Sequence, residues 1–268
     1  MKKKKNTLLW SLVHPQFDGV SYLFGTMHVS DERAFRYVDI VKEKIDNCDA
    51  FALEFNLDAA ALGITNEAMN LPAGTTLESL IPAKKFEKIN KRFEGLTGYD
   101  LRMFNQSIPM QITNMMAGIV LSNDRLKSLD ETLFQYAKEQ DKLLLGIETF
   151  EEQLNILGKI PIENQLKSML KVFKNFPKFR KQVIKMTQLY ESGNITQLYK
   201  STKKSIGGER QLLLYDRNEI MADRVSKMIN EQTVVGAIGA AHLSGKKGVL
   251  RLLKRKGIQV KPVKTQLG

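Results

Sequence analysis

The pattern of apolar and polar positions near the start of the chain predicts a strand, a helix and a second strand. Residues 22–24 form a short apolar run that is typical of a strand. Apolar residues then recur every three or four positions over 34–45, as on one face of a helix that begins at Ser30. Residues 50–55 form a second apolar run, which contains Glu54. A strand, a helix and a strand in this order predict a pair of parallel strands.

The other end of the chain repeats this plan. Apolar runs at 233–238 and 258–263 predict strands, and an amphipathic pattern over 249–256 predicts the helix between them. A further strand is predicted at 142–148, after a helix over 130–139. We therefore expect an α/β fold with a mainly parallel central sheet built from both termini.

Composition describes an ordinary globular protein with a basic surface. The 268 residues are 43% hydrophobic and 26% charged, with a formal net charge of +12. The single Cys48 excludes an internal disulfide, and we expect it to be a small buried residue rather than a nucleophile. No apolar run is long enough for a transmembrane helix or a signal peptide, so we expect a cytoplasmic protein, although a leader that preceded residue 1 would not be seen.

Four side chains that can bind metal or transfer protons lie at or just after predicted strand ends. They are His28, Glu54, Glu148 and His242. Because the carboxyl ends of parallel strands share one edge of a sheet, we expect these side chains to converge. Gly25 and Gly239 each stand three residues before a histidine, and glycine lets the backbone turn sharply close to a ligand.

Two imidazoles with one or two carboxylates make a mixed nitrogen and oxygen ligand set. Such a set suits Mn, Fe, Co or Zn, and a bound ion of this kind supports hydrolysis by activating water. The sequence thus predicts a divalent metal held by His28 and His242 with one or both of the carboxylates Glu54 and Glu148. Simpler interpretations stay open, because a histidine in such a turn can serve a structural hydrogen bond, and Glu148 can cap a helix that begins near Phe150.

Charged and amide groups at Asp216-Arg217-Asn218-Glu219 precede a predicted amphipathic helix. Arg217 can hold a carboxylate or an oxyanion, with Asn218 beside it, or it can form a structural salt bridge. The predicted catalytic group is therefore Glu54, Glu148, Arg217 and Asn218, in which Glu54 either activates water or completes the metal shell. His14 lies before Pro15 in a loop and is expected to be exposed.

Blocks of sequence along nearly the whole chain together resemble the TraB/GumN family, which contains pheromone-shutdown proteins and is related to the Tiki metalloproteases. The blocks are Leu9-Trp10-Ser11, Tyr22-Leu23-Phe24-Gly25-Thr26-Met27-His28, Leu53-Glu54, Leu71-Pro72-Ala73-Gly74-Thr75-Thr76-Leu77, Gly146-Ile147-Glu148-Thr149, Glu152-Gln153-Leu154, Arg217-Asn218 and Gly239-Ala240-Ala241-His242-Leu243-Ser244-Gly245. They follow the family's order. One departure is Ser128, where the family usually has Gly before a helix.

The resemblance implies a core similar to the erythromycin-esterase/ChaN-like superfamily, with helical insertions that cover the site. It implies a single TraB/GumN-like domain over 1–268, with helical excursions at about 60–140 and 150–232. It also implies a divalent metal, Mn or Co in the Tiki branch, around the paired Gly-x-x-His turns, with a strand-end glutamate needed for proteolysis. This implied site maps onto His28, His242 and Glu54.

The leading hypothesis is a metal-dependent hydrolase that acts as a peptidase on peptides or small proteins. A second is a protein that binds and sequesters a peptide or a small-molecule ligand without turnover. A third makes the Lys-rich segment 159–204 a contact surface for an anionic membrane, although a core-facing helix with a lysine-coated outer side explains the same pattern. No motif indicates specific nucleic acid binding, and nothing in the sequence indicates an oligomeric state.

Overall fold

The computed structural model describes residues 6–59, 69–121 and 124–264. The chain divides into two compact units, the first made of residues 1–63, 123–153 and 186–268, and the second of 64–122 and 154–185. Each unit has its own hydrophobic core. The helical excursions expected at about 60–140 and 150–232 supply all of the second unit, and the interpretation of 1–268 as one family domain stays a prediction.

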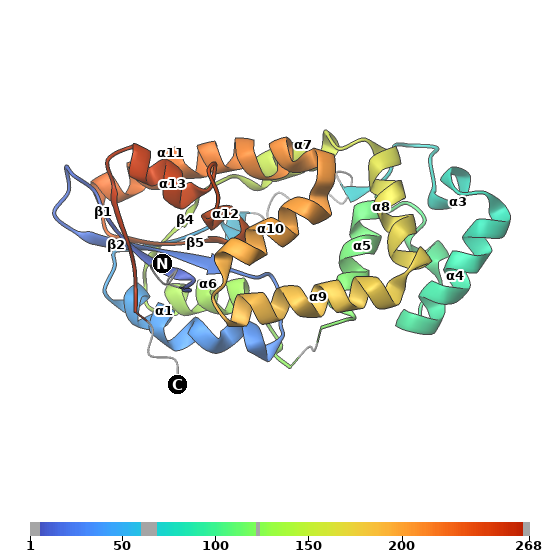
Figure 1. Ribbon diagram of the computed structural model, residues 1–268, viewed down its shortest axis with the longest axis horizontal. Coiled ribbons are helices and arrows are strands. Elements are labelled where there is room, and N and C mark those ends of the chain that lie inside the picture. Colours follow the sequence, from blue (N-terminus) through green and yellow to red (C-terminus); the bar gives the residue numbers. More distant parts are fainter. Residues whose placement is uncertain (1–5, 60–68, 122–123, 265–268) are drawn as a thin grey trace. The chain divides into compact units, whose positions relative to one another are not determined.

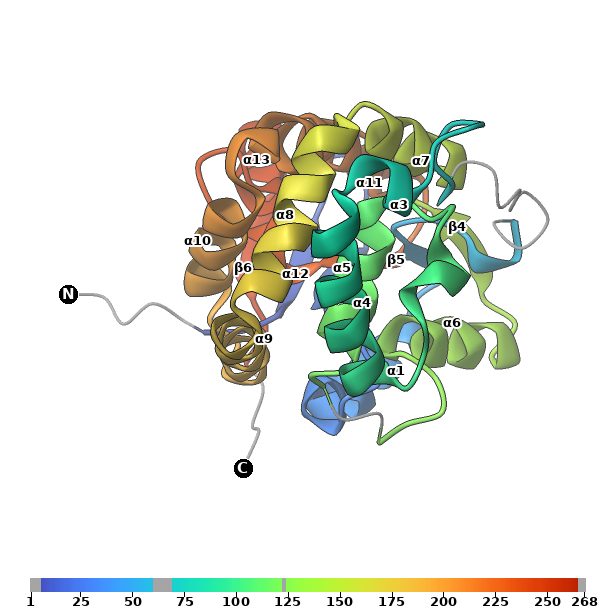
Figure 2. The same cartoon turned by 90° about the vertical axis from the view of Figure 1, so that its right-hand side faces the viewer.

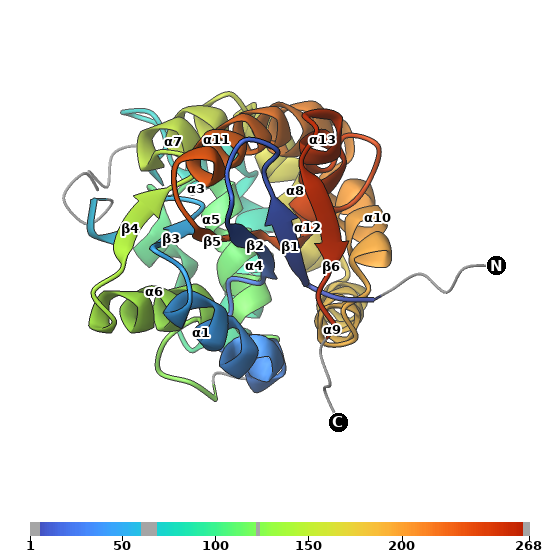
Figure 3. The same cartoon turned by 90° about the vertical axis from the view of Figure 1, so that its left-hand side faces the viewer.

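The first unit is built on a six-stranded sheet with the order β4-β3-β5-β2-β1-β6, whose strands lie side by side in Figure 3. Four neighbouring strands are parallel: β2 (Val20–Thr26), β3 (Ala50–Leu53), β4 (Leu143–Gly146) and β5 (Val234–Gly239). The other two are antiparallel to their neighbours: β1 (Leu9–Val13) and β6 (Gln259–Pro262). The predicted α/β class, with a mainly parallel sheet built from both termini, is confirmed.

Helices cover both faces of this sheet (Figure 1). On one face lie α1 (Val38–Asp46) and α6 (Leu129–Glu139), and on the other lie α11 (Arg217–Glu231) and α13 (Val249–Arg255). Because both faces are covered, β3 and β5 consist of apolar residues and glycine, and every residue of β3 is buried. The remaining helices with residues in this unit are α7 (Phe150–Gly158), α9 (Phe176–Glu191), α10 (Ile195–Ile206) and α12 (Ala240–Leu243).

Local chemistry corrects several predicted boundaries. The first helix begins after Asp31, whose side chain accepts a hydrogen bond from the Arg33 N–H, and its first part, Glu32–Tyr37, is a 3-10 helix. The segment expected to be a turn at 239–242 contains α12. Phe176 and Pro177 begin α9, because Pro fits the first turn of a helix, where its missing N–H is not needed.

The second unit is helical. Its helices are α3 (Leu77–Leu80), α4 (Ala83–Thr97), the 3-10 helix Leu101–Phe104, α5 (Pro109–Gly118) and α8 (Ile162–Lys174), several of which face the viewer in Figure 2. Phe86 and Phe93 of α4 pack in its core with Phe173 of α8. The guanidinium of Arg92 donates to the Phe173 carbonyl over 2.8 Å, which ties the two helices together. Across the described part of the chain, no helix combines the length and the apolar character needed to cross a membrane.

The buried Cys48 gives a first test of the core of the first unit. Cys48 is 3% exposed, and burial raises the pKa of its thiol to about 11. A hydrogen bond with Thr233 lowers the pKa and offsets only part of this effect. Because the thiolate is the reactive form, alkylation of the folded protein near pH 8 is expected to be roughly a hundredfold slower than that of the unfolded protein. Equal labelling rates with and without denaturant would contradict this burial.

Candidate functional site

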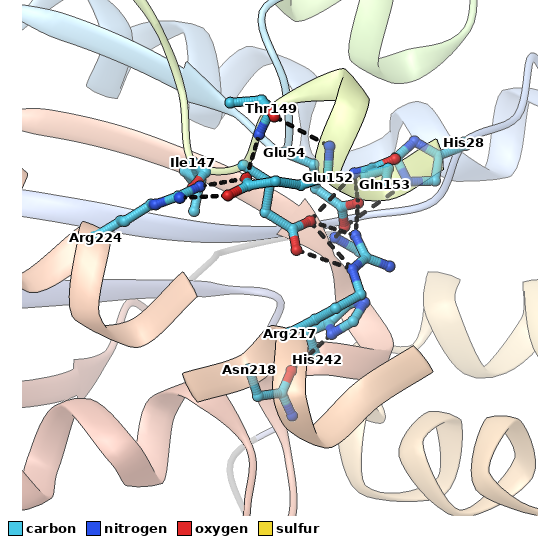
Figure 4. Close-up of polar contacts among 12 residues, drawn as sticks. His28, Glu54, Ile147, Thr149, Glu152, Gln153, Arg217, Asn218, Arg224 and His242 are labelled. Carbon is cyan, nitrogen blue, oxygen red and sulfur yellow. Dashed lines mark hydrogen bonds and ion pairs between the residues drawn. The ribbon is translucent and has the colours of Figure 1, made fainter. Parts of the chain in front are cut away.

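The four strand-end residues predicted from the sequence lie at one edge of the sheet. Glu54 directly follows β3, Glu148 lies two residues after β4, His28 lies two residues after β2, and His242 lies in α12, directly after β5. These four strands are neighbours in the sheet, so their carboxyl ends lie together. Figure 4 shows His28, Glu54 and His242 together with Arg217 and Asn218.

Gly239 is the point around which the two histidines and the carboxylate gather. Its N–H donates to Oε1 of Glu54 over 2.6 Å. A Cβ atom on Gly239 would lie 3.1 Å from that oxygen, 3.4 Å from Cδ2 of His242 and 3.9 Å from Nε2 of His28. Both imidazoles and Glu54 therefore surround one small volume, and the absence of a side chain at position 239 is what lets them approach it.

His242 is held in one tautomer by Asn218. The Asn218 side chain is fully buried and donates its amide N–H to the Lys247 carbonyl over 2.6 Å. Its oxygen must then be the atom that lies 2.7 Å from Nδ1 of His242, and it accepts the Nδ1–H. Nε2 of His242 therefore carries the lone pair. Burial lowers the pKa of His242 to about 4, so this ring is neutral near pH 7.

His28 is held by Asp130, a residue that the sequence analysis did not single out. Nδ1 of His28 lies 3.0 Å from Oδ2 of Asp130, and Nε2 lies 4.0 Å from Oε1 of Glu54. The His28 side chain is 55% exposed, whereas Asp130 is 6% exposed. Desolvation lowers the pKa of His28, but Asp130 and Glu54 outweigh it and raise the pKa to about 9. The imidazole is therefore protonated near pH 7 in this state.

Arg217 joins the two buried carboxylates. Its Nη2 lies 2.8 Å from Oε2 of Glu54 and 2.5 Å from Oε2 of Glu148, and its Nε donates to Oε1 of Glu148 over 3.0 Å. The Gln153 amide also donates to both carboxylates, over 3.2 Å each. Burial raises the pKa of Glu54, but His242, His28 and Arg217 outweigh it and lower the pKa to about 2. Glu54 is thus an ionised carboxylate.

The end of β4 is fixed by a separate network, and this network decides the open question about Glu148. Thr149 and Glu152 cap the start of α7, since each donates its backbone N–H to the other's side chain, so Glu148 is not the cap. Arg224 pairs with both oxygens of Glu152 over 2.7 Å and donates to the Ile147 carbonyl. Glu148 is left to face Arg217.

Two contributors to this site were missed in the sequence. Asp130 stands in the first turn of a predicted helix, where an acid is explained by the helix dipole alone. Gln153 lies within the family-like block Glu152-Gln153-Leu154, but a glutamine in an amphipathic helix carries no chemical signal by itself. Membership of this block was the only evidence in the sequence that pointed to Gln153. For Asp130, nothing in the sequence distinguished a residue of the site from an acid that caps a helix.

The donor atoms at this edge of the sheet are of the kinds that suit a divalent ion. Within residues 6–59, 69–121 and 124–264, however, no three His, Cys, Asp or Glu side chains stand arranged to hold a metal ion. Two ligand atoms that each lie about 2.1 Å from a shared ion are separated by at most about 4.2 Å. The 4.0 Å between His28 Nε2 and Glu54 Oε1 falls within that limit. Ligation requires His28 to lose its proton.

Comparison with known proteins places the chain in a family. The sequence model of the TraB/PrgY/gumN family matches residues 8–262, and the chain belongs to this family. A Danio rerio protein named metalloprotease TIKI2 is 23% identical, with 97% of this chain and 61% of that protein covered. A Nematostella vectensis protein named metalloprotease TIKI homolog is 22% identical, with 99% of this chain and 69% of that protein covered.

A Homo sapiens protein named metalloprotease TIKI1 is 23% identical over 95% of this chain and 61% of its own length. The chain thus spans less than two thirds of the Danio rerio relative and of the human one. No solved structure matches it. The resemblance inferred from the sequence blocks is confirmed, and the names of the relatives indicate a metal-dependent, protease-like family.

Proposed function

We propose that the protein is a metal-dependent hydrolase that cleaves peptide bonds in peptides or small proteins. The ion, Mn or Co in the first instance, is held by His28, His242 and Glu54. The observation that carries this proposal is the gathering of two imidazoles and one carboxylate oxygen within 4 Å of a single point above Gly239. The names of the relatives support the same class of activity.

The chain prepares the two imidazoles for ligation in different ways. His242 is already neutral, and Asn218 directs its Nε2 lone pair away from the amide. Asp130 holds Nδ1 of His28 and leaves Nε2 on the side of Glu54. Asn218 and Asp130 are therefore positioning residues, because a partner on one ring nitrogen fixes the orientation and basicity of the other.

The carboxylates are prepared by Arg217. Arg217 holds Oε2 of Glu54 and both oxygens of Glu148, so Oε1 of Glu54 is left on the side of His28. A bound divalent ion supplies polarisation of a carbonyl and a lowered pKa for water. Glu54, ionised near pH 7, accepts a proton from water or completes the ligand set, and Arg217 orients the site or the substrate.

Metal binding near pH 7 is expected to release one proton, which comes from His28. The pKa of His28 lies at about 9, so the ring is charged at pH 7 and must be neutral to ligate, whereas His242 releases none because its pKa lies at about 4. Apparent affinity should therefore rise by about tenfold per pH unit between pH 7 and 9. Calorimetric titration of Mn in two buffers with different ionisation enthalpies measures the released proton.

Asp130→Asn is the matched variant for this titration. This variant removes the negative charge that outweighs desolvation of the ring, so the pKa of His28 falls. Fewer than one proton should then be released for each ion bound at pH 7. Equal proton release by the wild type and Asp130→Asn, or no release by the wild type, would contradict the assignment of His28 as a ligand.

The activity itself is tested with a peptide library and the metal-free protein. Added Mn or Co is expected to start cleavage, and a chelator to stop it. A matched control is His14→Ala, since His14 lies outside the site and its Nδ1 accepts a local hydrogen bond from the Gln16 N–H. Saturable peptide binding that needs no metal, with the peptide recovered intact, would instead support the sequestering hypothesis.

A further inference from the structure

A cavity lies in the first unit, apart from the candidate metal site. It has a volume of about 280 Å³ and is lined by residues of β1, α10, α13 and the segment that joins α12 to α13. None of the six residues predicted as catalytic or metal-binding lines it. Its volume is at the small end of the range for ligand pockets, which suits a molecule with few non-hydrogen atoms.

One wall of this cavity is apolar and contains the only tryptophan of the chain, Trp10. Ile195, Leu243 and Leu250 complete that wall, and all three are buried. The indole Nε1 of Trp10 is buried and has no hydrogen bond partner within the part of the chain that the structure describes. Such unpaired donors are uncommon in folded proteins, and a ligand acceptor that displaced the atoms covering it would satisfy it.

Two of the residues that line the cavity are cationic. Arg251 and Lys254 are exposed, and their spacing of three residues puts both on one face of α13. Neither forms an ion pair with any residue in the described ranges 6–59, 69–121 and 124–264. Among the residues that the structure describes, no acidic one lines the cavity, and Asn6, Thr196 and Ser244 add neutral hydrogen-bonding groups. Two unpaired cations beside an apolar wall match a molecule with an acidic head and an apolar body.

We propose that this cavity binds a small organic anion, whose carboxylate or phosphate pairs with Arg251 and Lys254 while its short apolar body packs against Trp10 and Leu250. An anionic head gains charge-assisted hydrogen bonds from both cations. The site is independent of the proposed hydrolase, because it shares no residue with the metal site.

The position of Trp10 makes binding directly measurable by intrinsic fluorescence. Hexanoate and hexyl phosphate, added to the full chain at millimolar concentrations, are expected to change the Trp10 emission saturably. Hexanol has the same body without the charge and should bind at least about tenfold more weakly, because a hydrogen bond to a charged group is lost. A difference between the two acids shows which head group the cavity prefers. Ligand-detected NMR on the same samples reports binding that leaves the fluorescence unchanged.

The double variant Arg251→Gln/Lys254→Gln should weaken binding of both acids by about tenfold or more and leave binding of hexanol unchanged. The control Arg255→Gln/Lys261→Gln removes the same charge from exposed positions outside the cavity and should leave all three affinities unchanged. Absence of saturable binding by fluorescence and by NMR would overturn the proposal. Equal loss of affinity for the acids in the two double variants would also overturn it, because binding would then depend only on the net charge of the surface.

Discussion

His242→Ala is expected to abolish metal-dependent peptide cleavage, with a fall in kcat/KM of more than about a hundredfold. Loss of a partner that merely orients a metal-ligating histidine costs roughly 10- to 100-fold in affinity or activity, so loss of the ligand itself should cost more. The His242 ring is neutral near pH 7 and therefore able to bind a metal ion. His28 supplies the one other imidazole beside it within the described residues. Cleavage of one identified peptide by the wild type and the variant, at equal Mn, measures the effect.

Two comparisons separate a lost ligand from a lost fold. His14→Ala removes the remaining histidine of the chain and should retain full activity. Thermal unfolding of the metal-free proteins should show His242→Ala folded, and added Mn should raise the unfolding temperature of the wild type but not of the variant. Undiminished cleavage by a folded His242→Ala would refute the assignment of this residue.

Arg217→Met is expected to cost about 3–5 kcal/mol in the free energy of unfolding near pH 7. Breaking a buried ion pair by removal of one partner leaves an uncompensated charge, and here two carboxylates lose their shared cation. The Arg217 side chain is 13% exposed, and those of Glu54 and Glu148 are 7% and 1% exposed. Urea unfolding monitored by circular dichroism gives the difference.

The stability lost in Arg217→Met should become smaller as the pH falls. In the wild type the folded-state pKa of Glu54, about 2, lies below its ordinary value of 4.5, so its stabilisation is present above about pH 4.5 and is lost toward pH 2. In Arg217→Met, Glu54 loses one of the charges that lower its pKa and protonates more readily, so the gap in stability between the two proteins should narrow as the pH falls from 7 to 4. A gap that widens in acid would contradict this origin.

Arg102→Met is the matched control for charge removal. Arg102 pairs with Glu78, Glu87 and Asp100, but its side chain is 40% exposed, so its loss should cost much less stability than the loss of Arg217. Addition of Glu148→Gln to Arg217→Met should recover part of the lost stability, since it removes one of the two uncompensated charges. Equal losses for Arg217→Met and Arg102→Met would mean that Arg217 acts as an ordinary surface charge.

The sequence predicted the core of the fold because strong periodic signals coincide there with glycine-containing turns. The strands that carry Glu54, Glu148 and His242 were identified from apolar runs, and the parallel arrangement then required their ends to meet. β1 was missed. Its five residues include Trp10 and Ser11 and follow a basic stretch, so the run was weighed against a signal peptide and noted in the family-like block Leu9-Trp10-Ser11, but it was not interpreted as a strand.

The partners of the site residues were harder to predict than the residues themselves. Asp130 and Gln153 reach the site from helices, and which face of a helix meets the end of a strand depends on tertiary packing that no local pattern encodes. For Arg217 the sequence allowed both an oxyanion-binding and a structural role. Its contacts show a guanidinium that joins two carboxylates, which is a property of the folded pair and not of the segment Asp216–Glu219.

Anomalous X-ray diffraction from crystals grown with Mn locates a bound ion and its ligands together. We expect one strong peak beside Gly239, bonded to Nε2 of His28, Nε2 of His242 and a carboxylate oxygen of Glu54. A peak coordinated without either imidazole, or crystals soaked in Mn that show no peak at this edge of the sheet, would contradict it.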